Sequence, residues 1–390
     1  MKQLKTIYDL AIHGASPAFD EPLHVGRPNI GSKKEFLKYA EEIFERRWLS
    51  NNGPLLQEFE QKIADYHSVK HCVAMCNGTV ALEIAIRALG LTGEVIVPSY
   101  TFIATAHALS WQAITPIFAD IDPITHNLDP DAVRKMITPR TSGIIGVHLW
   151  GRAAPVGALQ ALADEYNLKL MFDAAHAFGC SYQGKMIGNF GQCEVISFHA
   201  TKFFNTFEGG AVLTNDDELA EAMRLMRNFG FSGLDNVIYS GTNGKMIEVA
   251  AAMGLVNLAA IDTVITTNRQ NYEEYQDKLS DVYGVSLLEF DESEQNNYQY
   301  VVMEVSQNCS VSRDQIVEAL HAENILARKY FWPGCHNMTP YRELFPHAGL
   351  LLPNTQKIAD RVVVLPTGTM INKQDINVVV DIIKLCSSNN

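Results

Sequence analysis

Lys202 is the residue of this sequence whose surroundings most need a chemical explanation. It lies in the stretch SFHATKFFNTFEGG, residues 197–210, among small, aromatic and hydroxyl-bearing side chains, and the first acidic residue after it is Glu208. The stretch CEVISF that leads into this segment and the stretch AVLTND that follows it are typical of strands. A loop lysine is usually a solvated cation, whereas an amine enclosed by apolar groups loses its proton more readily and can act as a nucleophile.

Other polar residues lie at the ends of predicted strands, where a parallel α/β sheet binds its ligands. Asp173 follows the apolar stretch LKLMF, His176 comes three positions later, and Ser197 follows the apolar stretch CEVI. The turn NGT, residues 77–79, precedes the predicted helix VALEIAIRAL, whose free N–H groups and dipole favour an anion such as phosphate. Taken singly, each feature has an ordinary structural explanation as a helix cap, a metal ligand or a surface lysine.

Together these residues are the parts needed to hold pyridoxal phosphate. A lysine amine forms a Schiff base with the aldehyde and later transfers protons. A carboxylate keeps the pyridine nitrogen protonated, so that the ring can accept electrons from a carbanion. The helix that follows Asn77 would hold the phosphate, and Phe102, just past the predicted strand VIVPSYT, would stack on the ring. The combination therefore predicts an enzyme that uses pyridoxal phosphate.

The elements that would position these residues follow an alternating pattern. Short apolar runs such as GEVIVPSY, ITPIFADID, TSGIIGVHLWG and LKLMFDAAHAFG alternate with helical stretches such as PVGALQALADEYN. This pattern predicts an α/β fold whose large domain has a mostly parallel central sheet flanked by helices. From about Met246 it changes to one long helical stretch, residues 247–279, and then to a smaller α+β region. We therefore expect a large domain over residues 1–264, including the N-terminal segment, and a small C-terminal domain over residues 265–390.

Composition argues against several other classes of protein. The 390 residues are 47% hydrophobic and 19% charged, which is ordinary for a globular protein with a large core. The net charge of −13 disfavours a nucleic-acid-binding surface, which requires a basic face. No apolar run approaches the length of a membrane span, and the N-terminus lacks the apolar core of a signal peptide. The seven cysteines form no CxxC pair, so we expect no metal site and a reducing, cytoplasmic location.

The motifs resemble those of the DegT/DnrJ/StrS family of fold-type I aminotransferases, which act on nucleotide-linked keto sugars. The resemblance extends over nearly the whole chain and rests on RWLSNNGPLLQEFE, NGTVALEIA, VIVPSYTFIATA, FADIDP, GVHLWG, FDAAHAFG, SFHATKFFNTFEGGAVLTND, GTNGKM and YFWPGCHNMTPY. It implies that Lys202 is the Schiff-base lysine, that Asp173 contacts the pyridine nitrogen and that His176 lies at the ring hydroxyl. It also implies that Phe102 stacks on the ring. The residues implied to hold the phosphate are Gly78, Thr79 and Ser197.

The same resemblance implies roles for residues farther along the chain. Asn243, with assistance from Lys245, would reach the phosphate bound to a neighbouring subunit, so the enzyme would be a homodimer with shared active sites. Tyr330 and His336 of the small domain would line the sugar-nucleotide pocket. For His199, three positions before the lysine, we expect a packing role with one hydrogen bond rather than a catalytic role.

A particular reaction also follows from the resemblance. The stretches AFDEPLHVGRPN, GVHLWG and PTGT are most similar to a 4-aminotransferase that converts dTDP-4-keto-6-deoxy-D-glucose to dTDP-4-amino-4,6-dideoxy-D-glucose. L-Glutamate would donate the amino group and leave as 2-oxoglutarate, and pyridoxamine phosphate would carry that group between the two half-reactions.

Alternative activities differ in how well they fit the residues. A 3-aminotransferase acting on a 3-keto-6-deoxy nucleotide sugar stays open, because motifs alone do not fix regiochemistry. A pyridoxal phosphate-dependent nucleotide-sugar dehydratase of the same family would carry histidine in place of Lys202. A nicotinamide-dependent oxidoreductase would need a G-x-G-x-x-G turn after a strand, and no such turn is present.

Overall fold

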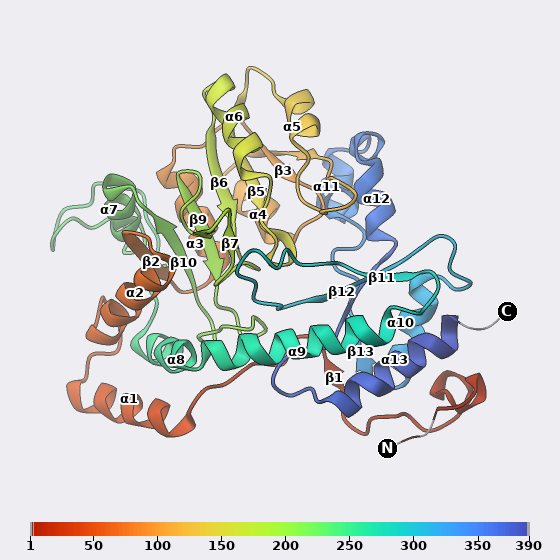
Figure 1. Cartoon of the computed structure of the whole chain (residues 1–390). Helices are drawn as coiled ribbons and strands as arrows, with labels where there is room; N and C mark the ends of the chain where they lie inside the picture. The colour runs from red at the N-terminus through yellow and green to blue at the C-terminus, as the bar shows by residue number, and fades with distance from the viewer. Residues whose placement is uncertain (1, 3, 388–390) are drawn as a thin grey trace.

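A seven-stranded sheet forms the centre of the molecule. The computed structural model describes residue 2 and residues 4–387, and Figure 1 shows the arrangement of their elements. The strand order is β2-β10-β9-β6-β5-β3-β4. Neighbouring strands are parallel except where β10 pairs with β2 and β9, which confirms the predicted mostly parallel sheet. In this order the strands span His71–Met75, Gly210–Thr214, Cys193–Ser197, Lys169–Asp173, Thr141–Val147, Glu94–Pro98 and Thr115–Ala119.

Alternate residues of these strands face two separate apolar layers, as the period of two in a strand requires. On β6, for example, Met171 packs into one layer, whereas Leu170 and Phe172 pack into the other. The first layer is covered by α3 (Gly78–Ala88), α4 (Ala104–Ser110) and α7 (Asp217–Met226). The opposite face is covered by α2 (Pro54–His67), α5 (Pro130–Met136), α6 (Val156–Tyr166) and α8 (Glu248–Ala259). Helices on both faces bury the sheet, so polar ligands reach it only at its edges.

The predicted long helix over residues 247–279 is wrong in one respect, because the chain bends there. Helix α8 ends at Ala259, α9 spans Ile261–Leu279, and the two axes differ by 61° across Ala260. Helix α8 packs on α2, whereas α9 runs along the C-terminal elements (Figure 1). Within the described residues no single helix is long and apolar enough to cross a membrane, although this bent pair passes the same test by length and composition.

The C-terminal elements form a smaller α+β unit. Its three-stranded sheet has the order β11-β12-β14, and helices α9, α10 and α13 pack beside it. The N-terminal segment, which we expected to belong to the large domain, packs here instead, because Leu10 and Leu23 are buried in the same apolar cluster and β1 pairs with β13. A domain boundary at residue 264 remains a proposal. The elements are β11 (Val285–Leu287), β12 (Val301–Val305), α10 (Arg313–Ala322), β13 (Ile325–Leu326), β14 (Val362–Leu365), α13 (Lys373–Ser387) and β1 (Leu23–His24).

The remaining α-helices and strands of the described chain are α1, β7, β8, α11 and α12. Helix α1 packs against α8, β7 and β8 form a small hairpin after β6, and α11 and α12 lie between β13 and β14. Their bounds are Lys33–Arg46 for α1, Ser181–Tyr182 for β7, Lys185–Met186 for β8, Thr339–Leu344 for α11 and Pro353–Ala359 for α12.

Candidate active site

Most of the predicted site residues line one cavity at the carboxyl ends of the central strands. The cavity has a volume of about 330 Å³ and receives residues from both the large domain and the C-terminal unit. This is the edge at which open α/β sheets bind their ligands. The predicted residues that line it are Gly78, Thr79, Phe102, Asp173, His176, Ser197, Lys202 and Tyr330.

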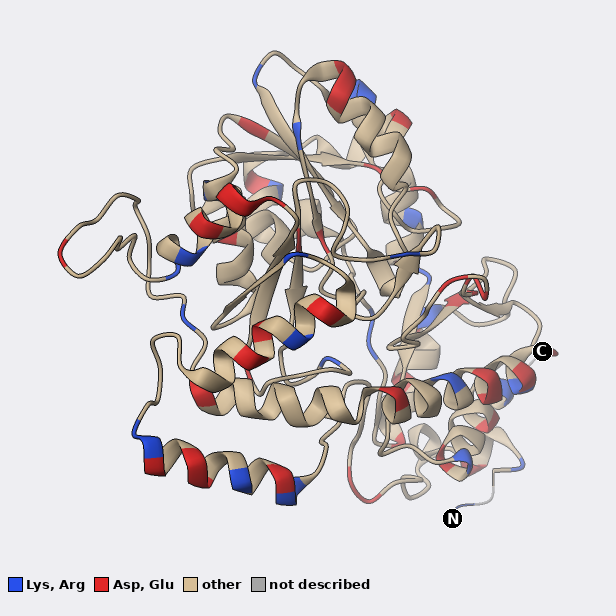
Figure 2. Cartoon of the chain, turned by 60° about the vertical axis from the view of Figure 1, so that its left-hand side comes forward, with Lys and Arg blue, Asp and Glu red and all other residues tan. Residues whose placement is uncertain are grey.

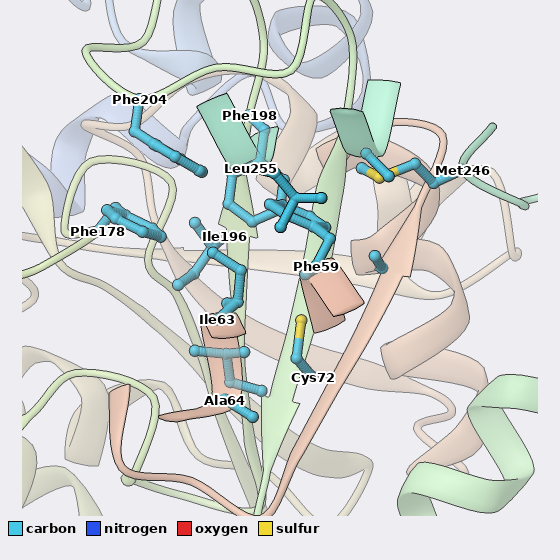
Figure 3. Close-up of a cluster of buried hydrophobic side chains, with 14 of the residues drawn as sticks. Phe59, Ile63, Ala64, Cys72, Phe178, Ile196, Phe198, Phe204, Met246 and Leu255 are labelled. Carbon is cyan, nitrogen blue, oxygen red and sulfur yellow. The ribbon is translucent and has the colours of Figure 1, made fainter. Parts of the chain in front are cut away.

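Lys202 lies in the loop that joins β9 to β10, and the aromatic residues around it anchor that loop. Phe203 and Phe204 are buried, and the Phe204 ring stacks on Phe178 with 4.2 Å between centroids. Figure 3 shows Phe178, Phe198 and Phe204 converging on the apolar core beneath the sheet. A turn in which the Lys202 N–H donates to the His199 carbonyl, at 2.8 Å, directs the chain between these anchors. The phenylalanines thus hold the loop in place while the lysine lines the cavity.

The Lys202 amine is largely buried and hydrogen-bonds to a phenol. Its Nζ donates to Tyr300 Oη over 3.3 Å. Burial lowers the pKa of Lys202 to about 8, although the charge of Asp173 and the Tyr330 phenol act in the opposite direction. A substantial fraction of the amine is therefore neutral slightly above neutral pH, as proton transfer by this group requires.

Asp173 is a buried carboxylate at the end of β6, with only 6% of its surface exposed. Its Oδ2 accepts a hydrogen bond from Thr105 Oγ1 at 2.8 Å, and its Oδ1 accepts one from the Ala175 N–H at 3.1 Å. Burial raises the pKa of Asp173, and these two hydrogen bonds partly offset that effect. Both donors are neutral groups, so a bound cation such as a protonated pyridine nitrogen would stabilise the charged carboxylate.

A close-packed corner brings the start of α3 against Ser197. Asn77 caps the helix, because its Oδ1 accepts a hydrogen bond from the Val80 N–H at 2.8 Å. A Cβ atom at Gly78 would lie 3.1 Å from Ser197 Cβ, and one at Gly210 would lie 2.6 Å from Gly78 Cα. Glycine at both positions therefore allows the hydroxyl of Ser197 to lie beside the N–H groups of the first helical turn. This corner fits a phosphate group.

Three further residues complete the described cavity wall. His176 is buried and accepts a hydrogen bond from the Trp150 N–H at 3.3 Å on Nδ1. Burial lowers the pKa of His176 well below its usual range, with a further contribution from the positive charge of Lys202. The Phe102 side chain is exposed at the cavity, and Tyr330 lines the wall contributed by the C-terminal unit. Stacking of Phe102 on a cofactor ring stays a prediction.

Three predicted site residues do not line this cavity. His336 is buried outside it, with Nδ1 2.7 Å from Ser99 Oγ. Asn243 is exposed to solvent. Lys245 borders a separate cavity of about 440 Å³ and donates a hydrogen bond to Asn228 Oδ1 at 3.0 Å. The functions implied for these three residues stay predictions.

The structure also shows site residues that sequence reasoning missed. His199, for which we expected packing with one hydrogen bond, lines the cavity with 46% of its side chain exposed, and its Nδ1 lies 2.9 Å from Thr201 Oγ1. Thr105 lies inside the motif VIVPSYTFIATA, and its position in the first turn of the helix after β3 was the available signal. Tyr300 carried no signal, because nothing local to the stretch NYQYVVMEV indicates contact with a lysine in another domain.

Comparison with known proteins places the chain among aminotransferases. The model of the DegT/DnrJ/EryC1/StrS aminotransferase family matches residues 31–384. The dTDP-4-amino-4,6-dideoxy-D-glucose transaminase of Escherichia coli is 37% identical over 372 residues, which cover 94% of this chain and 98% of that protein. The transaminase of the same name from Shigella dysenteriae is 36% identical over 367 residues, which cover 94% of this chain and 99% of that protein. A solved structure of DesI in the presence of its TDP-sugar product has a TM-score of 0.94 and 48% identity, covering 98% of this chain and 97% of that one.

Proposed function

We propose that this chain, which belongs to the DegT/DnrJ/EryC1/StrS aminotransferase family, converts dTDP-4-keto-6-deoxy-D-glucose to dTDP-4-amino-4,6-dideoxy-D-glucose with L-glutamate as amino donor. The observation that carries the proposal is the cavity in which Lys202, Asp173 and the start of α3 converge. Two relatives named for this amino sugar, together with DesI, support the choice of substrate. A location in the cytoplasm remains part of the proposal.

The residues of the cavity fit pyridoxal phosphate. Ser197 and the first N–H groups of α3 would hold the phosphate, and Asp173 would keep a proton on the ring nitrogen. Lys202 would hold the aldehyde carbon and, once released, its neutral amine would move the proton at the reacting carbon. The cofactor would supply the electron sink that stabilises charge on that carbon. His176 would contact the hydroxyl side of the ring, and Phe102 would exclude water from its face.

The substrate assignment predicts a single amino-sugar product. We expect the enzyme, given L-glutamate and dTDP-4-keto-6-deoxy-D-glucose, to form 2-oxoglutarate and a sugar that carries its new amine at C4. Two-dimensional NMR of the purified product locates the amine, because amination adds a proton to the former carbonyl carbon, and this proton resonates upfield of those on hydroxyl-bearing carbons. The 3-keto isomer, offered separately, serves as the control. An amine at C3, or faster turnover of the 3-keto isomer, would show that the enzyme is a 3-aminotransferase.

We further propose that the enzyme is a homodimer whose active sites are shared. The segment between α7 and α8 projects from the body of the molecule in Figures 1 and 2 and carries few charged residues. Leu234 is 92% exposed, and Val237 and Ile238 are about half exposed. Exposed apolar side chains in one segment favour contact with another protein surface. Asn243 lies near the end of this segment and does not line the cavity of its own chain. This position supports a role in the cavity of a second copy.

A subunit-mixing experiment tests whether Asn243 acts on the partner's cofactor. Lys202→Ala homodimers should be impaired because they lack the reactive amine. Asn243→Ala homodimers should be impaired because a lost hydrogen bond to a charged phosphate costs about 1.5–3 kcal/mol. If Asn243 acts in trans, each mixed dimer has one site with both defects and one with neither. Co-expression should then restore up to about half of wild-type activity per mixed dimer, since the sites are independent to first approximation.

The matched control combines two defects of the same cavity. Lys202 and Asp173 line one cavity of one chain, so mixed dimers of Lys202→Ala and Asp173→Ala should regain no activity. Two different affinity tags allow the mixed dimers to be isolated before assay. Absence of rescue in isolated Lys202→Ala/Asn243→Ala dimers would show that Asn243 serves its own subunit.

A further inference from the structure

Tyr300 connects the C-terminal unit to the reactive lysine. It lies immediately before β12, 98 positions from Lys202 in sequence, and its Oη lies 3.3 Å from the lysine Nζ. The Nζ atom also lies 5.9 Å from the centre of the Tyr300 ring. The lysine therefore meets the hydroxyl, rather than the face of the ring, of a residue that comes from the C-terminal unit.

Packing fixes the orientation of the Tyr300 ring. The side chain is only 8% exposed, and its ring centre lies 4.6 Å from that of His176 and 5.5 Å from that of Trp150. The His176 ring is itself held by the hydrogen bond from the Trp150 N–H. A phenol confined in this way cannot turn its hydroxyl away without disturbing two buried rings.

We propose that Tyr300 is a positioning residue that holds the Lys202 amine at its place in the cavity and couples the lysine to the C-terminal unit. A phenol both donates and accepts hydrogen bonds. It can accept from the lysine as an ammonium ion and donate to the same nitrogen once that nitrogen is neutral. The lysine thus keeps one partner in both states of the proton-transfer cycle. The inference rests on the proposed function only for the role of Lys202.

The other groups around Lys202 support this role for Tyr300. Burial raises the pKa of Tyr300 far above the working range, so its hydroxyl stays protonated and available to the amine. Asp173 acts on Lys202 through its charge, whereas its hydrogen bonds come from Thr105 and Ala175. The titratable groups that line the cavity around the lysine are Asp173, His176, His199, Glu208, Tyr300 and Tyr330.

The pKa of Lys202 in the cofactor-free protein tests the proposal directly. Timed labelling with an amine-selective reagent across a pH series, followed by peptide mapping, gives the midpoint for this one lysine. We expect a midpoint near 8 in the wild-type protein. In Tyr300→Phe it should fall by about 0.5–1 pH unit, because a hydrogen bond to an ion is stronger than one to a neutral amine.

Tyr298→Phe is the matched control. Tyr298 lies two residues earlier, is equally buried, and directs its hydroxyl to the Glu292 carboxylate at 2.9 Å. The same chemical change there should leave the Lys202 midpoint at its wild-type value. Thermal unfolding of both cofactor-free variants establishes that each retains the fold, and since each keeps its ring, we expect both to do so.

Kinetics of the loaded enzyme give a second readout. Tyr300→Phe should lower kcat about 3–10-fold with little change in KM for either substrate, because the lost hydrogen bond orients a proton-transfer group rather than a substrate. A folded Tyr300→Phe variant whose Lys202 midpoint and kcat both match wild type would overturn the proposal. If Tyr300→Phe shifts the Lys202 midpoint but the wild-type enzyme aminates no keto sugar, the positioning role of Tyr300 is supported and the proposed reaction is contradicted.

Discussion

Replacing Lys202 by alanine is expected to abolish amino transfer while leaving the fold intact. The residue lies in a loop held by Phe203 and Phe204 rather than by its own side chain, so truncation removes the amine without removing an anchor. Loss of a general acid–base group alone costs about 10²–10⁴-fold, and in the proposed function this amine would also hold the cofactor. We therefore expect a loss of at least about 10⁴-fold in single-turnover rate with L-glutamate, measured by cofactor absorbance.

Two control variants test whether activity requires an amine that can lose its proton, and whether it requires this lysine in particular. Lys202→Arg keeps a cation but cannot lose its proton at working pH, so it should be as inactive as the alanine variant. Lys185→Ala removes an exposed lysine of the same domain whose Nζ donates to the Asn189 carbonyl and lies over the Phe190 ring, away from the cavity, and it should be fully active. Borohydride reduction of the wild-type enzyme and peptide mapping should place the cofactor on Lys202. Label on another lysine would contradict the assignment.

The residues that lie at strand ends could be predicted from sequence. Asp173 ends β6 and Ser197 ends β9, as their apolar runs indicated, because a buried strand is marked by a local run of apolar residues that stops where the chain reaches solvent or a ligand. The capped start of α3 at Asn77 is equally local, since the cap bonds within its own turn. Local signals thus located the lysine, the carboxylate and the start of α3.

The bend at Ala260 could not be predicted from the same kind of signal. The stretch from Glu248 to Leu279 contains no proline, and its one glycine, Gly254, lies well before the bend, so a continuous helix was the expected result. In the structure α8 packs on α2, whereas α9 contacts α13 and β11 of the C-terminal unit. Packing on these different elements requires the axes of α8 and α9 to point in different directions, so tertiary packing overrides helix propensity at their junction.

Contacts between distant segments account for the remaining differences. Leu10 and Leu23 join the C-terminal cluster although they come before the large domain in sequence. Tyr300 reaches Lys202 only because the C-terminal unit packs against the carboxyl edge of the central sheet. Such contacts depend on the assembled fold and leave no periodic pattern in the sequence.

Replacing Asp173 by asparagine should leave a folded enzyme that transfers amino groups very slowly. Asparagine has nearly the same shape. Its carbonyl oxygen can accept the hydrogen bond from the Ala175 N–H, and its NH₂ group can donate to the Thr105 hydroxyl, which accepts as well as donates. Because burial raises the pKa of the carboxylate, removing its charge should not destabilise the cofactor-free protein. What is lost is the anion that would keep the ring nitrogen protonated, and with it most of the electron sink. We expect a cost of about 4 kcal/mol, or about 10³-fold in kcat.

Thr105→Val distinguishes the charge of Asp173 from its positioning. This variant removes the hydrogen bond to Oδ2 but keeps the carboxylate, so a partial loss is expected, at most about 1.5–3 kcal/mol. The pH dependence should also separate the variants. Without the Thr105 hydroxyl the pKa of Asp173 rises further. As the pH is lowered, Thr105→Val should therefore lose activity at a higher pH than the wild type does. Asp173→Asn has no carboxyl group at this position and should show no such loss on the acid side. Near wild-type kcat in Asp173→Asn would exclude a charged partner for the ring nitrogen, and the cavity would then have to support transamination through Lys202 and the phosphate corner alone.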